Sequence, residues 1–164
     1  MLIRDVMTID PVHVTMDATL RRAAEIVSLA EVSDLMVVDH HKRFIGVLSE
    51  GDMLRALLPD FQEIITAGGS LSDAFRFFVD KGRDLASRPI APLVITDAIT
   101  MLPTDEVAMA AAVMTEKQIR RLPVVEDGAL VGTVSRADLC RAVIYYAESE
   151  DPGDTSTDGA ARHR

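Results

Sequence analysis

The sequence predicts a fold made of two copies of one unit, each with the order strand, helix, strand, strand, helix. Two matching segments, residues 46–53 and 132–139, have corresponding residues that are all separated by 86 positions. Apolar residues at helical spacing precede both segments. Residues 59–88 have no counterpart in the other copy. A fixed period of this length indicates a duplicated unit, here with an insert between the copies.

Residues 1–58 supply the first copy. Alternating side chains predict a first strand, apolar residues at helical spacing a first helix, and two apolar runs a pair of buried strands. The first helix is expected to begin after Asp17, a suitable N-cap, and the second to begin at Ser49 and end before Pro59. The expected strands and helices are residues 12–14, 17–30, 35–38, 44–48 and 49–58.

The insert, residues 59–88, is predicted to be helical. Apolar residues at 61–65 give a short first helix, which Gly68 and Gly69 end. Ser70 opens a second helix, on which Phe75 and Phe78 are one turn apart. This apolar stripe must be covered by the body of the protein or by a partner chain.

Residues 89–147 supply the second copy in the same order. The patterns predict a strand at residues 98–101, a helix capped by Thr104, a strand at 122–125 and a last helix from Ser135 to about Tyr146. Residues 148–164 are rich in Asp, Ser, Thr and Gly and lack an apolar period, so we expect a disordered acidic and polar tail.

Composition excludes several classes of protein. The 164 residues carry a formal net charge of −9, which argues against a general nucleic-acid-binding role because that role needs a basic surface. The longest apolar runs are too short to span a bilayer, and no signal peptide opens the chain. A single cysteine, Cys140, fits a reducing compartment. We therefore expect a cytoplasmic protein without a membrane or nucleic-acid partner.

The two matching segments share a Ser-x-x-Asp sequence, which is typical of the start of a capped helix. Ser49 and Ser135 would cap their helices by accepting from the N–H of the third helical residue. Asp52 and Asp138, at that third position, would reach back to the N–H of the serine. One such copy predicts only a helix start, but two copies in matching surroundings also suggest a shared function.

The chain resembles a tandem pair of cystathionine β-synthase (CBS) domains, a Bateman module. The resemblance rests on these caps, on the Leu-Pro-Val-Val run at residues 122–125 and on their duplication. The resemblance covers about residues 1–58 and 89–147, and Met36 stands where the family usually has Pro. It implies an α+β fold in which two β-α-β-β-α repeats pack sheet to sheet with pseudo-two-fold symmetry, leaving two related clefts. Members of the family commonly bind adenosine derivatives there and change the behaviour of an attached or associated protein.

By this resemblance, Asp138 and Ser135 serve one cleft, and Asp52 and Ser49 serve the other. The chemistry is suitable, because a carboxylate has two acceptor oxygens for the ribose diol and a helix N-terminus attracts phosphate. Apolar residues of the strands would either line a slot for the adenine ring or pack only in the hydrophobic core. The candidates for that slot are Val12, Ile99 and Val124.

The two copies differ where phosphate would be bound. Arg120 and Arg121 precede the second Leu-Pro-Val run, and the equivalent positions in the first copy are Ser33 and Asp34. A guanidinium suits phosphate oxygens, whereas a carboxylate repels them. We therefore expect the arginines to make the cleft of Asp138 and Ser135 competent, and the cleft of Asp52 and Ser49 to be weak or empty. In the alternative, the two arginines are solvated or pair with Glu116.

No acid-base, nucleophile or metal-ligand constellation is evident, so neither an enzyme, a catalytic cofactor nor a metal site is predicted. His40 and His41 are adjacent without further ligands, and Cys140 is expected to pack in the core. Two interpretations remain. The chain is a stand-alone regulatory module that binds AMP, ADP, ATP or a related adenosine compound and modulates a partner protein, or it is a non-catalytic interaction module that dimerises without a ligand. A homodimer that buries Phe75 and Phe78 is expected under both.

Overall fold

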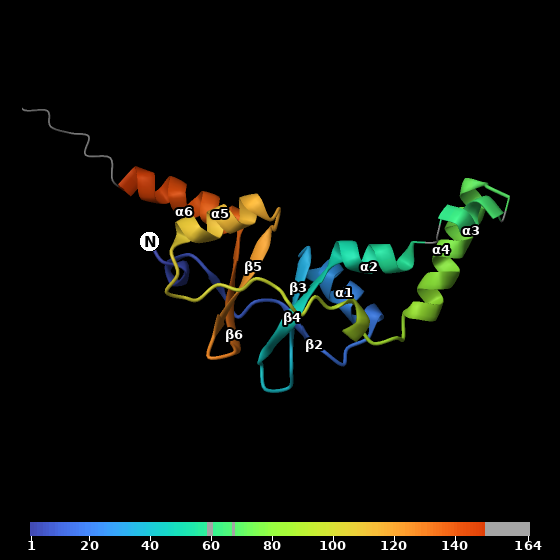
Figure 1. Ribbon diagram of the computed structural model, residues 1–164, viewed down its shortest axis with the longest axis horizontal. Coiled ribbons are helices and arrows are strands. Elements are labelled where there is room, and N and C mark those ends of the chain that lie inside the picture. Colours follow the sequence, from blue (N-terminus) through green and yellow to red (C-terminus); the bar gives the residue numbers. More distant parts are fainter. Residues whose placement is uncertain (59–60, 67, 150–164) are drawn as a thin grey trace, which may run out of the picture.

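The computed structural model describes residues 1–58, 61–66 and 68–149, and it has two halves, each with one three-stranded sheet (Figure 1). The first sheet has the order β2-β3-β4, with β2 parallel to β3 and β3 antiparallel to β4. The second has the order β1-β6-β5, with both pairs antiparallel. The strands are β1 (Thr8–Ile9), β2 (His13–Thr15), β3 (Asp34–Val38), β4 (Phe44–Ser49), β5 (Arg121–Glu126) and β6 (Ala129–Ser135).

Helices cover one side of each sheet. The helices α1 (Leu20–Ala30) and α2 (Glu50–Leu57) belong to the first half, and α5 (Val107–Glu116) and α6 (Arg136–Ser149) belong to the second. The insert forms α3 (Phe61–Thr66) and α4 (Leu71–Leu85), which extend away from the body beyond the end of α2 (Figure 1). Short 3-10 helices span Ile3–Asp5 and Ala91–Leu93.

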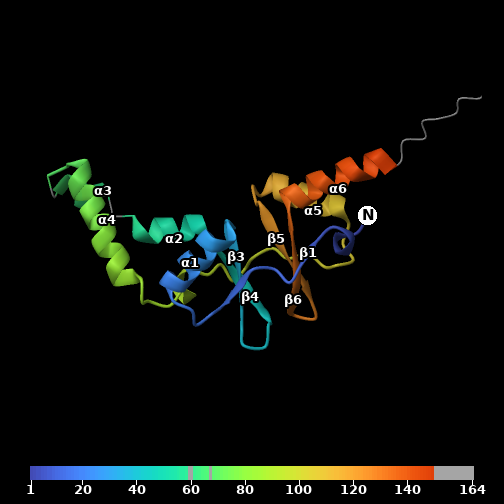
Figure 2. The same ribbon diagram turned by 180° about the vertical axis from the view of Figure 1, so that it is seen from behind.

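The segment that leads into each repeat is part of the other half. Thr8 of β1 pairs with Thr133 of β6, and the equivalent pair in the first half is the bridge between Ile95 and Val47. Figure 2 shows β1 beside β6 from behind. The N–H of Ile3 donates to the carbonyl of Asp105 at 2.8 Å, and a matching bond runs from Ile90 to Ala18 at 3.0 Å. These equivalent contacts define a pseudo-two-fold relationship between the halves.

The exchange of leading segments also builds the two hydrophobic cores. Ile3 is fully buried in the core of the second half, among residues of α5, β5, β6 and α6. Ile90 is fully buried in the core of the first half, among residues of α1, β3, β4 and α2. Because each core takes an isoleucine from the other repeat's leader, burial of apolar area ties the halves together.

The two hairpin turns join the sheets directly. The N–H of Phe44 donates to the carbonyl of Gly128 at 2.9 Å, and that of Leu130 donates to the carbonyl of Lys42 at 3.2 Å. Together with the pseudo-two-fold contacts, these bonds confirm the expected α+β fold of two repeats packed at their sheets. No helix within the described ranges is long and apolar enough to span a membrane.

Three expected element starts are wrong by one or two residues. The N-cap of α1 is Thr19 and not Asp17, because residues 16–18 remain in a turn bonded to the first sheet. The N-cap of α5 is Glu106 and not Thr104, because the N–H of Asp105 closes a turn onto Leu102. The strand β2 spans His13–Thr15, one residue after the expected 12–14.

The strand expected at residues 98–101 does not form. Met101 alone makes a bridge, to Val124, while Ile95 is bonded to Val47 of the other sheet. Residues 96–100 connect these two points, so they cross between the sheets and cannot follow either one. The last helix also runs longer than expected, to Ser149, and the rest of the expected tail, residues 150–164, lies outside the described residues.

Two side chains differ in exposure from the sequence expectations. Cys140 is exposed on α6 and does not pack in the core. On α4, Phe75 is 66% exposed whereas Phe78 is half-buried, so only part of the predicted stripe faces outward. The structure therefore leaves Phe75 open to solvent and Phe78 only partly exposed.

Candidate functional site

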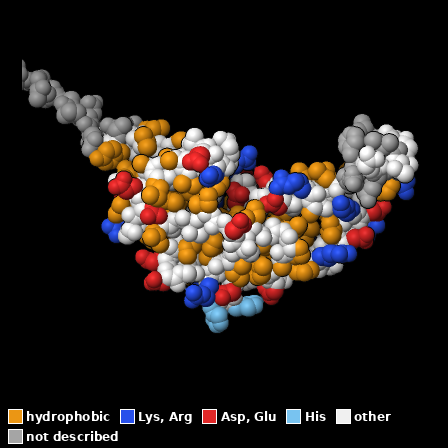
Figure 3. Space-filling model, viewed as in Figure 1, with side chains coloured by type: hydrophobic (Ala, Val, Ile, Leu, Met, Phe, Trp, Pro, Cys, Tyr) orange, Lys and Arg blue, Asp and Glu red, His pale blue; other side chains and the backbone are white. Residues whose placement is uncertain are grey.

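A cavity of about 520 Å³ lies between the two repeats. From the first repeat it is lined by Ser33 and by Asp34, the first residue of β3, and by the start of α2, including its N-cap Ser49. From the second it is lined by Ile99 and by the turn before β5. Figure 3 shows the hollow between the halves, with acidic and basic side chains at its edge. The volume is typical of a small-molecule site.

Backbone hydrogen bonds fix both turns beside helix N-termini. The carbonyl of Ser33 accepts from the N–H of Glu50, the first residue of α2, at 2.9 Å. The equivalent bond joins the carbonyl of Arg120 to the N–H of Arg136, the first residue of α6, at 3.1 Å. Each turn is thereby held next to the unpaired N–H groups and the positive end of a helix dipole.

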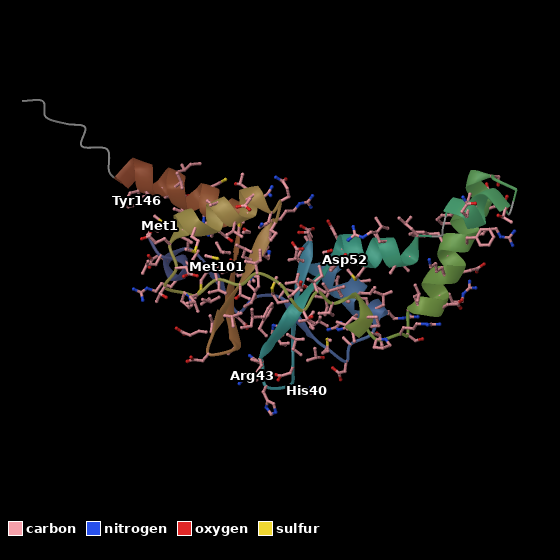
Figure 4. The ribbon with its side chains drawn as sticks, viewed as in Figure 1. Met1, His40, Arg43, Asp52, Met101 and Tyr146 are labelled. Atoms are coloured by element: carbon pink, nitrogen blue, oxygen red, sulfur yellow. The ribbon has the colours of Figure 1, made fainter. Side chains whose placement is uncertain are left out.

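Ser49 and Asp52 form the cap of α2 at the cavity wall. The Ser49 hydroxyl accepts from the N–H of Asp52 at 3.1 Å and donates to Asp52 Oδ2 at 2.6 Å. The other carboxylate oxygen, Oδ1, accepts from Arg55. The labelled Asp52 in Figure 4 sits at this helix start. Ser49 and Arg55 line the cavity, and both donate to the Asp52 carboxylate, which is not itself among the lining residues.

The pKa of Asp52 is lower than its ordinary value of 3.8. Burial raises the pKa, but the hydrogen bonds from Ser49 and Arg55 and the charge of Arg55 together lower it by more. Asp52 is therefore an anion with both oxygens engaged at neutral pH. Each carboxylate oxygen has two acceptor positions, so Oδ1 can accept from a ligand hydroxyl as well as from Arg55.

Ser135 and Asp138 form the complete capping box at the start of α6. Asp138 Oδ2 accepts from both the N–H and the hydroxyl of Ser135, at 2.9 and 2.6 Å, and Oδ1 accepts from Arg141 at 3.1 Å. Asp138 is only 7% exposed. Its carboxylate lines a different cavity, of about 450 Å³, with Met1 and Tyr146, which lie near each other in Figure 4.

Arg120 and Arg121 line the cavity that contains Ser49 and not the one that contains Asp138. Arg120 Nη1 lies 3.8 Å from Oε1 of Glu50 in the first repeat, so this ion pair joins the repeats. Arg121 Nη1 donates to the hydroxyl of Thr133 at 3.1 Å. The expected alternative partner, Glu116, instead pairs with Lys117. The structure thus combines the arginines of one copy with the cap of the other.

The three candidates for an adenine slot are dispersed. Ile99 lines the cavity between the repeats and is 38% exposed. Val124 is fully buried in the core of the second half, as the alternative interpretation expected. Val12 is exposed and lines neither this cavity nor the one beside Asp138. Only Ile99 is therefore brought together with Ser49 and the arginines.

Sequence reasoning missed two charged residues of the cavity, Glu50 and Arg55. Arg55 carried a signal, since Arg141 occupies the equivalent position in the second copy and both arginines bind the capping Asp. Glu50 differs in charge from its counterpart in the second copy, Arg136. A reversal of charge between two copies is a sequence signal for a difference between their sites.

A third Ser-x-x-Asp cap occurs in the insert. Ser70 caps α4 by accepting from the N–H of Asp73 at 3.1 Å, and its hydroxyl donates to Asp73 at 2.5 Å. This pair is exposed and lies outside the cavity between the repeats. The cap geometry alone therefore does not make a site, and the surroundings of Ser49 are what distinguish it.

A model of the CBS domain family matches residues 3–59 and 83–145, which is more than half of the chain. The chain belongs to the CBS domain family. It is 26% identical over 155 residues to an uncharacterized protein of Methanocaldococcus jannaschii, MJ1426, covering 88% of this chain and 92% of that one. It is also 25% identical over 127 residues to a homoserine O-acetyltransferase of Methanocorpusculum labreanum, covering 77% of this chain but 21% of that enzyme.

Solved CBS structures share the fold. The structure of CBSX2, an Arabidopsis thaliana protein, in complex with AMP has a TM-score of 0.68 and 25% identity over 89% of this chain and 98% of that one. The CBS domain pair of MJ0100, solved with 5′-methylthioadenosine and S-adenosyl-L-methionine, has a TM-score of 0.66 and 22% identity over 89% and 98%. Relatives of this chain thus bind adenosine derivatives.

Proposed function

We propose that this chain is a regulatory module that binds an adenosine derivative between its two CBS repeats and thereby modulates a partner protein. The observation that carries the proposal is the cavity where the Ser49 cap and the two arginines of the other repeat meet. The AMP complex of CBSX2, at 25% identity, supports the choice of ligand class. We propose no reaction, so the ligand is bound and not converted.

The ribose would be recognised by Asp52. Its carboxylate has two oxygens, and the hydroxyl of Ser49 fixes the orientation of one of them at 2.6 Å. A vicinal diol donates two hydrogen bonds, which suits a carboxylate acceptor. Each carboxylate oxygen has two acceptor positions, so the ribose would bind Oδ1 beside the Arg55 guanidinium, which stays bound to Asp52.

The phosphate would lie between Arg121 and the start of α2. Arg121 donates to a neutral hydroxyl, so this contact does not offset its positive charge, which can attract a phosphate. The N–H groups in the first turn of α2 and its dipole add to the attraction. The adenine would pack on the apolar wall that includes Ile95, Ile99 and Pro123.

Asp138 and Ser135 are proposed to form a second position for an adenosine compound. Their cap is equivalent to that of Ser49 and Asp52, but the cavity beside Asp138 is lined by Asp5, Arg141 and Tyr145 and not by Arg120 or Arg121. We therefore expect this position to bind phosphate-containing compounds more weakly than the cavity between the repeats.

A melting experiment tests the proposal. AMP, ADP, ATP, adenosine and S-adenosylmethionine are each added to the full chain, and to Asp52→Ala and Asp138→Ala. A ligand at about a hundred times its dissociation constant should stabilise the folded state by roughly 2.7 kcal/mol. We expect Asp52→Ala to remove most of the rise in melting temperature and Asp138→Ala to remove less. The proposal fails if no adenosine compound raises the melting temperature of the wild type.

Exposed apolar residues favour a second candidate, an interaction module that pairs with another copy of the chain or with a partner. Phe75 on α4 is 66% exposed, and Val143, Ile144 and Tyr145 on α6 are each at least 58% exposed. Large exposed apolar side chains are typical of protein interfaces, and here they lie at opposite ends of the molecule, on α4 and on α6 (Figure 1). We propose that the chain forms a homodimer, with or without a ligand. A pure interaction module would dimerise but would not respond to any adenosine compound.

A further inference from the structure

Charged side chains of both signs surround the cavity between the repeats in equal number. Three guanidinium groups and two carboxylates line the cavity, and a third carboxylate, Asp52, is bound to the lining residue Arg55, so the nearby charges sum to zero. The cations are Arg55, Arg120 and Arg121, and the anions are Asp34, Glu50 and, bound to Ser49 and Arg55, Asp52. A site built for a triphosphate would instead need a surplus of cations to match its charge.

The present partners of the three arginines further reduce the positive charge that is available to a ligand. Arg55 is bound to the Asp52 carboxylate, and Arg120 pairs with Glu50 at 3.8 Å. Arg121 has a neutral partner, the Thr133 hydroxyl at 3.1 Å. Of the three arginines, one is thus available to an anion without first breaking an ion pair. This capacity suits one phosphate group and not a chain of three.

Glu50 is the side chain that makes the site differ from its pseudo-symmetric counterpart. It is the first residue of α2, and the equivalent first residue of α6 is Arg136. Arg136 donates to the carbonyls of Ile119 and Met114, at 2.9 and 2.8 Å, whereas Glu50 lines the cavity and is half-exposed. A phosphate chain that runs along the start of α2 would therefore meet a carboxylate.

We infer that the cavity between the repeats selects adenosine compounds of low net charge, such as adenosine or AMP, over ADP and ATP, and that Glu50 is the residue that sets this preference. The inference rests on the proposed binding of adenosine compounds in this cavity. Its physical basis is repulsion between the negative β- and γ-phosphates and the Glu50 carboxylate, to which Asp34 adds. Solvent and salt screen these charges incompletely in a partly buried site.

Calorimetric titration of the full chain with adenosine, AMP, ADP and ATP, in buffer without divalent cations, tests the inference. We expect ATP to bind the wild type about tenfold more weakly than AMP, the effect of one close like-charge contact. Glu50→Gln should strengthen ATP binding several-fold and leave adenosine unchanged. Glu50→Arg, which copies the residue of the second repeat, should strengthen ATP binding further. Added salt should narrow the difference between AMP and ATP in the wild type.

Glu25→Gln is the matched control. Glu25 lies on α1, is 52% exposed and pairs with Arg22 at 3.7 Å, so its exposure and ion pair resemble those of Glu50 at 55% and 3.8 Å. Its substitution should leave the preference for AMP unchanged. Equal affinity of the wild type for AMP and ATP would overturn the inference alone, as would an equal gain for adenosine and ATP in Glu50→Gln. Binding of none of the four compounds would overturn the proposed function and this inference with it.

Discussion

The hydroxyl of Ser135 lies 2.6 Å from Oδ2 of Asp138, which also accepts from the N–H of Ser135 at 2.9 Å. The same serine-to-carboxylate contact occurs between Ser49 and Asp52 and between Ser70 and Asp73. The three caps differ in surroundings, since Asp138 is 7% exposed while the Ser70 cap is exposed. We therefore expect burial to decide how much each cap stabilises its helix.

Replacing the capping serines with alanine should rank them by burial. Ser135→Ala should lower the free energy of unfolding by about 2 kcal/mol, because the buried Asp138 loses the hydroxyl donor and its own N–H loses an acceptor. Ser70→Ala should cost about 0.5–1 kcal/mol, because water can replace its bonds. Urea unfolding measures both values, and equal losses would contradict the dependence on burial.

Two glycines at equivalent positions should differ in their tolerance of alanine. A Cβ on Gly46 would collide with the carbonyl oxygen of Ile95 and lie 2.8 Å from Val94 Cγ1. A Cβ on Gly132 would meet the flexible side chain of Met7 at 2.9 Å and the Thr8 carbonyl oxygen at 3.0 Å. We expect Gly46→Ala to cost roughly 2–3 kcal/mol and Gly132→Ala about 1 kcal/mol. A larger loss for Gly132→Ala by urea unfolding would refute this ranking.

Asp52 should contribute to stability only above acidic pH. Its lowered pKa favours the ionised form in the folded state, so the contribution is complete above the ordinary value of 3.8 and is lost as pH falls through the lower folded value. Asp52→Asn should therefore destabilise by about 1 kcal/mol at pH 7. Its difference from the wild type should shrink below about pH 4. Urea unfolding from pH 7 to 3 checks this.

The control for this series is Asp84→Asn, which removes the same charge from an exposed position on α4. Its effect on the free energy of unfolding should stay small at every pH. A constant difference between Asp52→Asn and the wild type from pH 7 to 3 would show that the Asp52 carboxylate is not what stabilises the cap.

Arg121 should distinguish AMP from adenosine. Arg121→Ala removes the guanidinium proposed to meet the phosphate, so AMP binding should weaken about tenfold while adenosine binding changes by less than about twofold. Arg22→Ala, an exposed arginine on α1, is the control and should change neither affinity. Calorimetric titration gives both values, and equal losses for the two ligands would refute the phosphate role of Arg121.

Phe75 should contribute to association if the insert is in the dimer interface. Phe75→Asp places a charge where 66% of an aromatic side chain is exposed, and it should convert a dimer into a monomer in sedimentation. Ser72→Asp, which adds the same charge to an exposed position on α4, is the control. An unchanged mass for folded Phe75→Asp, with dissociation of Ile144→Asp, would move the interface to α6.

Local patterns explain what was predictable. The duplication, the order of elements in each repeat and the helix starts at Ser49, Ser70 and Ser135 follow from apolar period and capping chemistry, which act between residues close in sequence. The expected helix starts after Asp17 and Thr104 were wrong because turns bonded to other segments delay each helix by two residues. The strand expected at residues 98–101 was lost because its neighbours are bonded to two different sheets.

The candidate site could be predicted from the sequence only in part. The sequence by itself identified the Ser49 and Ser135 caps, Arg120 and Arg121, and it grouped the arginines with Asp138 of their own repeat. The tertiary structure instead puts the arginines on the cavity beside Ser49, across the pseudo-two-fold relationship. Membership of a repeat is a property of the chain, but which turn faces which helix depends on how the two sheets pack. That packing is fixed by the exchanged segments around Ile3 and Ile90, whose burial no local pattern reveals.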